Sequence, residues 1–234
     1  MTDEELEAMH ERKRARTLAR NKKSVRSVQF RRSFWILCAA FFVLIDQLSK
    51  WYVMEQVMRP YRMGAEGATF TDWITNATGI IPFSQIYVTS YFNLVLAWNK
   101  GVSFSMFGDI GEYGPLILII VALIITGTFS LWLWNAEKHF HGICNALVIG
   151  GALGNVLDRI RFGAVIDFLD FHIGEHHWPA FNIADMCIVI GICLLVFVSL
   201  FVETSTRHRY RKQMSEKRHR QNRLRQRFKL DIKK

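Results

Sequence analysis

The sequence predicts an integral membrane protein that is mainly α-helical, with four transmembrane helices and a few short strands outside the membrane. Three observations predict this fold class. The 234 residues are 50% hydrophobic, the apolar residues gather in four long runs, and the basic residues gather in the two tails. The mean hydropathy is +0.11 although both tails are polar, so the centre of the chain is more apolar than a water-soluble domain requires. This composition excludes disorder throughout, a collagen-like repeat and a disulfide scaffold.

Each apolar run is long enough to cross a bilayer. A helix needs about 20 mostly apolar residues to cross about 30 Å of hydrocarbon, because it rises about 1.5 Å per residue. The second run carries no charge, and the other three carry their charges near one end. We take the first run as a retained span, because no small-residue cleavage site of a signal peptide accompanies it. The expected spans are 34–53, 115–134, 143–160 and 183–202.

The charge distribution predicts how the four spans are oriented. Residues 1–32 hold 10 basic and 5 acidic side chains, and residues 203–234 hold 13 and 3. Lys and Arg collect on the cytoplasmic side of membranes, so both tails are expected in the cytoplasm, as an even number of spans requires. Segments 54–114 and 161–182 are acidic overall and are expected on the outer face. The membrane domain is then 33–202.

The basic tails are expected to contact anionic lipid headgroups of the membrane. Arg-rich stretches such as 217–227 also resemble nucleic-acid-binding patches. Beside four spans, contact with phospholipids is the simpler explanation, and we expect no nucleic-acid partner.

The outer segment 54–114 contains a stretch that is typical of strands. Residues 85–98 are rich in β-branched and aromatic side chains with partial alternation, which predicts strands on the membrane surface. Residues 56–82 contain Gly, Thr, Asn and Pro and are expected to form a long loop. The sequence assigns no function to that loop.

Ionisable groups in or beside a span are costly, so each needs a physical reason. Asp46 and Lys50 are four residues apart on the first span and are expected to form a structural ion pair along one helix face. On the third span, Gly150 and Gly154 allow a neighbouring helix to approach closely.

The third span ends in Asn155, Asp158 and Arg159, with Asn155 and Arg159 on one helix face. These three residues are expected either to satisfy one another in a polar network or to line a site. Packing arguments alone favour neither reading.

Two further carboxylates, Asp167 and Asp185, are expected at the same outer interface. Gly163 permits a turn before Asp167, and Asp185 lies one helical turn after Asn182. Two carboxylates close together in a low dielectric cannot both ionise, so they share one proton. Such a pair can hydrolyse an amide, since one member accepts a proton from water while the other hydrogen-bonds the scissile carbonyl. Transporters also place carboxylates at such positions, so the pair alone does not decide the function.

Five short motifs lie along the predicted membrane domain. They are DQLSK at 46–50, FNLVLAWNKG at 92–101, GGALGNVLDR at 150–159, GAVID at 163–167 and FNIAD at 181–185. Together and in this order they resemble the bacterial lipoprotein signal peptidase family, also called signal peptidase II. The resemblance covers most of 34–202 and leaves out both tails and residues 56–82.

The resemblance implies an aspartic endopeptidase of the bacterial inner membrane. It implies a four-transmembrane-helix bundle with a small extracytoplasmic β-cradle, both termini in the cytoplasm and the active site at the outer face. Such an enzyme removes the signal peptide from a prolipoprotein whose lipobox Cys carries diacylglycerol, and it cuts on the N-terminal side of that Cys. No cofactor or metal is implied, and a monomer is expected.

Motif position also implies the roles of individual residues. The catalytic dyad falls on Asp167 and Asp185. The positions that match substrate-binding residues are Asn99, Asn155, Arg159 and Asn182, and the supporting structural positions are Asp46, Lys50, Gly101 and Asp158.

Two rival functions have weaker support in the residues. A metalloprotease would use His172, Glu175, His176 and His177, but no HExxH spacing is present and three consecutive residues would not converge on one metal. A proton-coupled carrier would use the carboxylates of the spans. Those of the third and fourth spans lie at span ends, however, and no internal repeat is visible.

Overall fold

The computed structural model describes residues 3–76, 79–101, 113–136, 138–203 and 214, and within 3–26 it describes the backbone alone. The chain divides into two compact units, Met1–Gly191 and Ile192–Lys234. All candidate site residues belong to the first unit. The expected basic tail 203–234 lies almost entirely outside the described residues.

Among the described residues, four helices are long and apolar enough to span a membrane, which confirms the predicted fold class. The helical candidates extend beyond the predicted first and third spans, because the helices continue into polar sequence on both sides of each apolar run. The four candidates are Ser27–Met63, Gly114–Trp134, His139–Phe162 and Ile183–Phe201.

The first helix of the bundle is continuous over three elements, and strands lie between it and the second spanning helix and between the third and the fourth. The first begins in the basic N-terminal segment and runs through a π-helical stretch into a short third part. In chain order these elements are α1 (Asp3–Trp51), η1 (Tyr52–Met58), α2 (Arg59–Met63), α4 (Gly114–Trp134), α5 (His139–Phe162), α6 (Ile183–Phe197) and η4 (Val198–Glu203).

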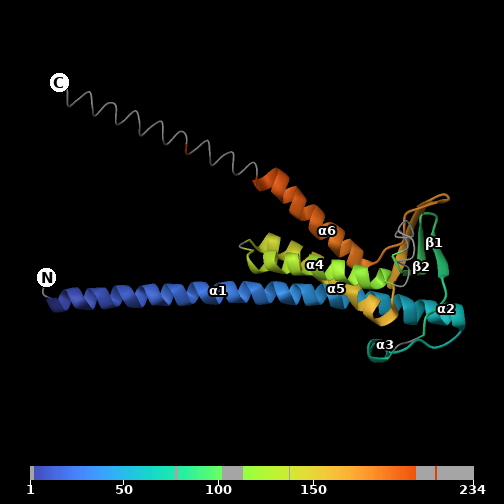
Figure 1. The fold of residues 1–234 in the computed structure, drawn as a ribbon, viewed down its shortest axis with the longest axis horizontal. Coiled ribbons are helices and arrows are strands. Elements are labelled where there is room, and N and C mark those ends of the chain that lie inside the picture. The colour runs from blue at the N-terminus through green and yellow to red at the C-terminus, as the bar shows by residue number, and fades with distance from the viewer. Residues whose placement is uncertain (1–2, 77–78, 102–112, 137, 204–213, 215–234) are drawn as a thin grey trace, which may run out of the picture. The chain divides into compact units, whose positions relative to one another are not determined.

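Helix α5 is the buried member of the bundle and lies along both α1 and α4 (Figure 1). Its apolar window is 67% buried, whereas the windows of the other three candidates are at most 17% buried. The exposed Leu, Ile, Val and Phe side chains of those helices are therefore suited to face lipid. Small residues allow the close packing of α5: a Cβ at Gly150 would lie 2.6 Å from the Cβ of Phe42 and 2.8 Å from the carbonyl oxygen of Ala39. The predicted close approach at this glycine is confirmed.

The segment expected to be a long loop, 56–82, is partly helical, so this prediction is wrong in part. Helix α2 ends at Gly64, whose φ of 63° is the left-handed conformation that favours glycine. Helix α3 (Phe70–Thr75) begins after Thr69, whose side chain accepts a hydrogen bond from the backbone N–H of Asp72 at 3.1 Å. Both capping signals are present in the sequence.

Four antiparallel strands form one sheet in the order β1-β2-β3-β4. The predicted strand region 85–98 is confirmed as a hairpin of the first two strands. The third strand was not predicted, because its first four residues are all buried and give no alternation of polar and apolar side chains. The strands are β1 (Ser84–Thr89), β2 (Phe92–Asn99), β3 (Val165–Ile173) and β4 (His176–His177).

The chain passes twice along the same part of the sheet before α6 begins. In the register of β2 and β3, Ala97 lies opposite Asp167. After β4, Phe181 pairs with Leu169: its N–H donates to the Leu169 carbonyl at 3.1 Å and its carbonyl accepts from the Leu169 N–H at 2.9 Å. This pairing holds the residue that follows, Asn182, beside β3.

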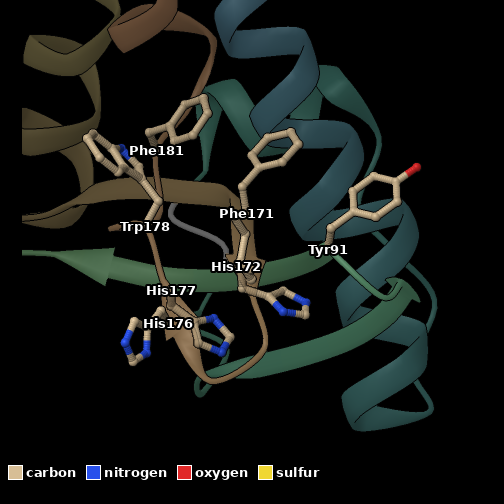
Figure 2. Close-up of a pocket in the computed structure, with 8 residues that line it drawn as sticks. Tyr91, Phe171, His172, His176, His177, Trp178 and Phe181 are labelled. Atoms are coloured by element: carbon tan, nitrogen blue, oxygen red, sulfur yellow. The ribbon is translucent and has the colours of Figure 1, made fainter.

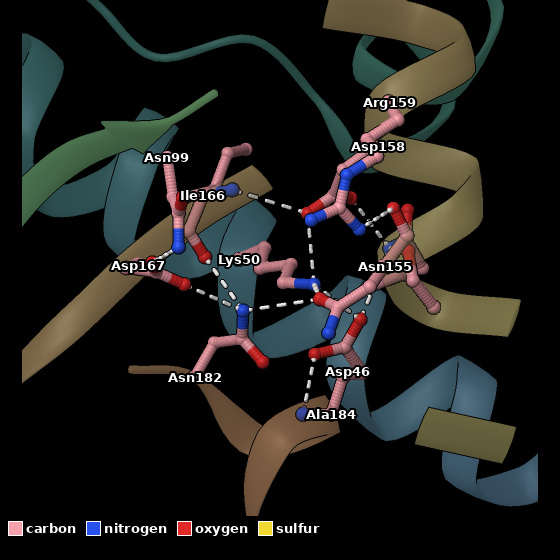
Figure 3. A network of polar contacts seen from close by, with 12 residues as sticks. Asp46, Lys50, Asn99, Asn155, Asp158, Arg159, Ile166, Asp167, Asn182 and Ala184 are labelled. Carbon is pink, nitrogen blue, oxygen red and sulfur yellow. Dashed lines mark hydrogen bonds and ion pairs between the residues drawn. The ribbon is translucent and has the colours of Figure 1, made fainter. Parts of the chain in front are cut away.

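Three fully buried charges join α1 to α5. The Nζ of Lys50 lies 2.7 Å from Oδ2 of Asp46 and 2.8 Å from Oδ2 of Asp158. The predicted pair of Asp46 and Lys50 is therefore part of a triad. Other elements occupy the remaining acceptor positions, since the N–H of Ala184 donates to Asp46 at 2.9 Å and the N–H of Ile166 donates to Asp158 at 3.2 Å (Figure 3). The triad thus fixes α6 and β3 as well as α1 and α5.

The close approach at Gly150 gives a prediction about stability. Gly150→Ala should lower the free energy of unfolding by about 1–3 kcal/mol, because the added methyl group meets the backbone of α1. Gly127→Ala in α4 is the matched control, since a Cβ there meets nothing within 4 Å and Ala favours a helix over Gly by up to about 1 kcal/mol. Thermal unfolding in detergent measures both variants. Equal stability of the two would contradict the packing of α5 on α1.

Candidate active site

Polar side chains from four elements meet at the end of the bundle beside the sheet (Figure 3). They come from the end of β2, the C-terminal half of α5, the middle of β3 and the start of α6. Side-chain hydrogen bonds join all of them except the guanidinium of Arg159. The structure therefore brings together the residues expected to catalyse and bind: Asn99, Asn155, Arg159, Asp167, Asn182 and Asp185.

Asp167 lies in the middle of β3 and is 2% exposed. The amide Nδ2 of Asn99 donates to its Oδ2 at 2.9 Å, and the amide Nδ2 of Asn182 donates to its Oδ1 at 2.8 Å. Burial, followed by the neighbouring charge of Asp185, raises the pKa of Asp167 to about 7, and the two amide hydrogen bonds oppose this rise. Asp167 is therefore a carboxyl group that can hold or release a proton near neutral pH.

Asp185 lies in the first turn of α6 and is partly exposed. The Nδ2 of Asn155 donates to its Oδ1 at 2.8 Å. Asn182 contacts both aspartates, because its Nδ2 donates to Asp167 while its Oδ1 accepts the backbone N–H of Asp185 at 3.0 Å. Two asparagine amides thus fix the position of one carboxyl group relative to the other.

Asn99 is itself held by Gly101. The N–H of Gly101 donates to Oδ1 of Asn99 at 2.8 Å, so the amide must turn its Nδ2 toward Asp167. The φ of Gly101 is 80°, a conformation that favours glycine, and a Cβ at this position would collide with Leu118 of α4. These contacts explain why the motif needs glycine two residues after Asn99.

Arg159 does not pair with Asp158, so of the two alternatives left open for Asn155, Asp158 and Arg159, the mutually satisfied network does not form. Neighbouring residues of a helix point about 100° apart, and Asp158 turns toward Lys50. The Nη1 of Arg159 instead donates to the carbonyl oxygen of Asn155 at 3.4 Å. Within the described part of the chain, its Nε is buried without a hydrogen-bond partner, which leaves a donor for a ligand beside the two aspartates.

Gln47 is a buried member of the network that sequence reasoning missed. It is 3% exposed, and its Nε2 donates to Oδ1 of Asp158 at 2.9 Å. The same nitrogen lies 3.2 Å from Oδ2 of Asp46. A signal for it was present, because an amide inside an apolar run is costly unless it is hydrogen-bonded.

The histidines considered for a metal site line a separate pocket at the β3–β4 end of the sheet (Figure 2). Among the residues that the structure describes, no group of three or more His, Cys, Asp or Glu side chains is placed to hold a metal ion. The pocket has a volume of about 740 Å³, and neither Asp167 nor Asp185 lines it. One of its lining residues, Phe181, directly precedes Asn182 of the candidate site. Its lining residues are Tyr91, Phe171, His172, Ile173, His176, His177, Trp178 and Phe181.

His177 has a different partner from a metal ion. Its Nδ1 lies 2.9 Å from the carboxylate of Asp170, which also accepts a hydrogen bond from Asn93 at 2.8 Å. Burial raises the pKa of Asp170, but the hydrogen bonds from Asn93 and His177 outweigh it and hold that pKa below its usual value. This chain of contacts ties β2, β3 and β4 together.

The chain is similar to known peptidases over most of its length. A family model described as "Signal peptidase (SPase) II" matches residues 38–201. The lipoprotein signal peptidase of Sphingopyxis alaskensis is 37% identical over 170 residues, which cover 72% of this chain and 86% of the relative. That of Cupriavidus taiwanensis is 35% identical over 184 residues, covering 78% and 90%. That of Aeromonas hydrophila is 42% identical over 166 residues, covering 69% and 85%.

Two solved structures, each described as a bacterial membrane enzyme, have a similar fold. One superposes with a TM-score of 0.52 at 24% identity and covers 73% of this chain and 94% of its own. The other has a TM-score of 0.50 at 26% identity and covers 74% and 91%. Since the family model spans well over half of the residues and the relatives match along most of their length, the chain belongs to the signal peptidase II family.

Proposed function

We propose that this chain is an aspartic endopeptidase that removes the signal peptide from diacylglyceryl-modified prolipoproteins, cutting on the N-terminal side of the lipidated Cys. Family membership supports a peptidase that acts on lipoprotein precursors. The single observation that carries the aspartic mechanism is the pair Asp167 and Asp185, held together by Asn155 and Asn182.

The position of the pair suits a lipid-anchored substrate. Asp185 lies in the first turn of a membrane-spanning helix, and Asp167 lies on the strand beside it. The acyl chains of a diacylglyceryl-cysteine remain in the hydrocarbon, so the neighbouring peptide bond is held at the membrane surface. Enzyme and substrate would then present their reacting groups at the same depth.

Hydrolysis needs one protonated and one ionised carboxyl group. Asp167, the more buried of the two, is the member that holds the proton, and its hydroxyl donates a hydrogen bond to the scissile carbonyl oxygen. Asp185 accepts a proton from water as the water oxygen attacks the carbonyl carbon, and Asp167 transfers its proton to the carbonyl oxygen, which gives a neutral diol. When the resulting diol collapses, the C–N bond breaks, Asp185 gives its proton to the leaving nitrogen, and Asp167 regains its own from the diol.

The substrate backbone also needs partners when it leaves water, because an unpaired buried carbonyl is costly. The buried Nε of Arg159 is a donor without a partner among the described residues, and it is placed to bind such a carbonyl. Within the same proposal, Asn99, Asn155 and Asn182 line the substrate cleft while they hold the aspartates.

The charge distribution supports the proposed location of the enzyme. The basic tails favour both termini on the cytoplasmic side of the bacterial inner membrane, in contact with anionic phospholipids. The sheet and the aspartates would then lie at the outer face. All of the proposed site residues lie in one chain, so a monomer is sufficient for the proposed activity.

The direct test is cleavage of a diacylglyceryl-modified prolipoprotein by the purified protein in detergent with EDTA present. Asp167→Asn and Asp185→Asn should each lower kcat by about 10²–10⁴ fold, because proton transfer is lost at nearly constant side-chain volume. Asp72→Asn, which changes an exposed carboxylate of α3, is the control and should cleave like the unchanged protein. Full turnover by either dyad variant would refute the assignment, and a folded but inactive unchanged protein would refute the function.

The raised pKa of Asp167 gives a separate prediction about stability and pH. The folded protein binds this proton more tightly than the unfolded chain, whose Asp has a pKa of about 4. The stabilisation is therefore complete below about pH 4 and is lost as the pH rises to about 7. The melting temperature of the unchanged protein should fall relative to that of Asp167→Asn across this window. A difference that stays constant with pH would contradict the buried, protonated carboxyl group.

A further inference from the structure

The segment 64–76 follows α2, in the part of the chain to which the resemblance assigns no role. It is firmly attached to the end of the first helix. The Nε1 of Trp51 and the Nε2 of Gln56 both donate to the carbonyl oxygen of Ala68, at 2.9 Å and 3.0 Å. The N–H of Ala68 donates to the fully buried carboxylate of Glu55 at 3.1 Å. These contacts make the segment a fixed part of the structure around the site.

The same segment is fixed to the C-terminal turn of α5 through Arg161. Trp73 of α3 is fully buried, stacks on Phe70 and also contacts the ring of Phe162. The guanidinium of Arg161 lies 4.0 Å from the centre of the Trp73 ring, and its Nη2 donates to the carbonyl oxygen of Trp73. The cation therefore binds both the ring and the backbone of this residue.

The other side of the same guanidinium reaches the buried network. The Nη1 of Arg161 donates to Oε1 of Gln47 at 3.4 Å, and the Nε2 of Gln47 donates to Oδ1 of Asp158 at 2.9 Å. The second oxygen of Asp158 accepts the N–H of Ile166 at 3.2 Å. Ile166 directly precedes Asp167 on β3, so this line of hydrogen bonds ends at the backbone that carries the catalytic candidate.

We propose that Arg161 is a positioning residue that couples segment 64–76 to Asp167 through Gln47 and Asp158. The inference rests on the proposed function. Arg161 fixes the orientation of the Gln47 amide, because its donor occupies Oε1 and leaves Nε2 to face Asp158. Without Arg161, Oε1 of Gln47 loses its donor, and the amide is held only through Nε2, by Asp158, Asp46 and the carbonyl oxygen of Gly154. The Asp158 carboxylate, which Lys50 and Gln47 hold from its two oxygens, can then tilt under the N–H of Ile166. The carboxyl group of Asp167 then shifts relative to Asn99 and Asn182.

A positioning role predicts a change in turnover rather than in substrate binding. Arg161→Met removes every donor but keeps an apolar chain against Trp73. It should lower kcat about ten- to a hundredfold, because a small misplacement of a reacting group has that effect, while KM changes less than threefold. Arg161→Lys keeps the charge but cannot reach Trp73 and Gln47 together, and it should recover part of kcat. Arg62→Met, which changes an exposed arginine of α2, is the matched control and should leave kcat and KM unchanged.

A double-mutant cycle tests whether the effect passes through Gln47. The loss of kcat in Arg161→Met combined with Gln47→Leu should be no larger than the greater of the two single losses. If the fold loss of kcat in the double variant equals the product of the two single losses, the route through Gln47 is overturned. A lower melting temperature of Arg161→Met with unchanged kcat would overturn the proposal itself, because a merely structural residue behaves in that way.

A second readout does not need activity. For each protein, the melting temperature is compared with that of the same protein carrying Asp167→Asn. The pH at which this difference changes reports the surroundings of the Asp167 carboxyl group. Arg161→Met should shift this pH by at least half a pH unit, and Arg62→Met should not. If Arg161→Met leaves the pH of this change where it is, the role of Arg161 is overturned, whether or not the protein without substitutions cleaves. If that protein does not cleave but Arg161→Met shifts the pH, only the proposed function is refuted.

Discussion

The rest of the site depends on the ammonium group of Lys50, buried between the carboxylates of Asp46 and Asp158. All three side chains are removed from solvent, so any of them left without its partner would incur a large desolvation cost. Oδ1 of Asp46 accepts the backbone N–H of Ala184 at the start of α6, and Oδ2 of Asp158 accepts the N–H of Ile166 in β3 beside the Lys50 ammonium group. One ammonium group therefore determines where the two elements that carry Asp185 and Asp167 can lie.

Asn155 connects these structural charges to the catalytic candidates. Its Oδ1 accepts hydrogen bonds from Lys50 at 3.1 Å and from Asn182 at 3.1 Å, so its Nδ2 is left to face Asp185. The Asn155 amide thus fixes the position of the Asp185 carboxylate relative to the buried ammonium group of Lys50. The charges of Lys50, Asp46 and Asp158 neutralise one another. The carboxyl groups of Asp167 and Asp185 contact neutral amides instead, so both sets of groups can lie in the same apolar surroundings.

Local patterns predicted much of the fold, and contacts between distant residues explain what they missed. The apolar runs, the i,i+4 spacing of Asp46 and Lys50 and the β-rich stretch 85–98 each correspond to structure that forms from neighbouring residues. The first four residues of strand β3 are buried on both faces and give no alternation of polar and apolar side chains, so their pattern did not predict a strand. The partner of Asp158 is 108 residues away in the chain, and no spacing rule could choose Lys50 over the adjacent Arg159. The family motifs named residues that the structure brings together, because such motifs already encode distant contacts.

The proposed mechanism requires that one carboxyl group of the pair, that of Asp167, holds a proton near neutral pH. Infrared difference spectroscopy tests it directly, because a protonated carboxyl group has a carbonyl stretch that the carboxylate lacks. The spectrum of the purified protein should contain a buried carboxyl band that disappears with a midpoint near pH 7 and is missing from Asp167→Asn. A band that persists in Asp167→Asn, or no carboxyl group titrating near that pH, would contradict the account.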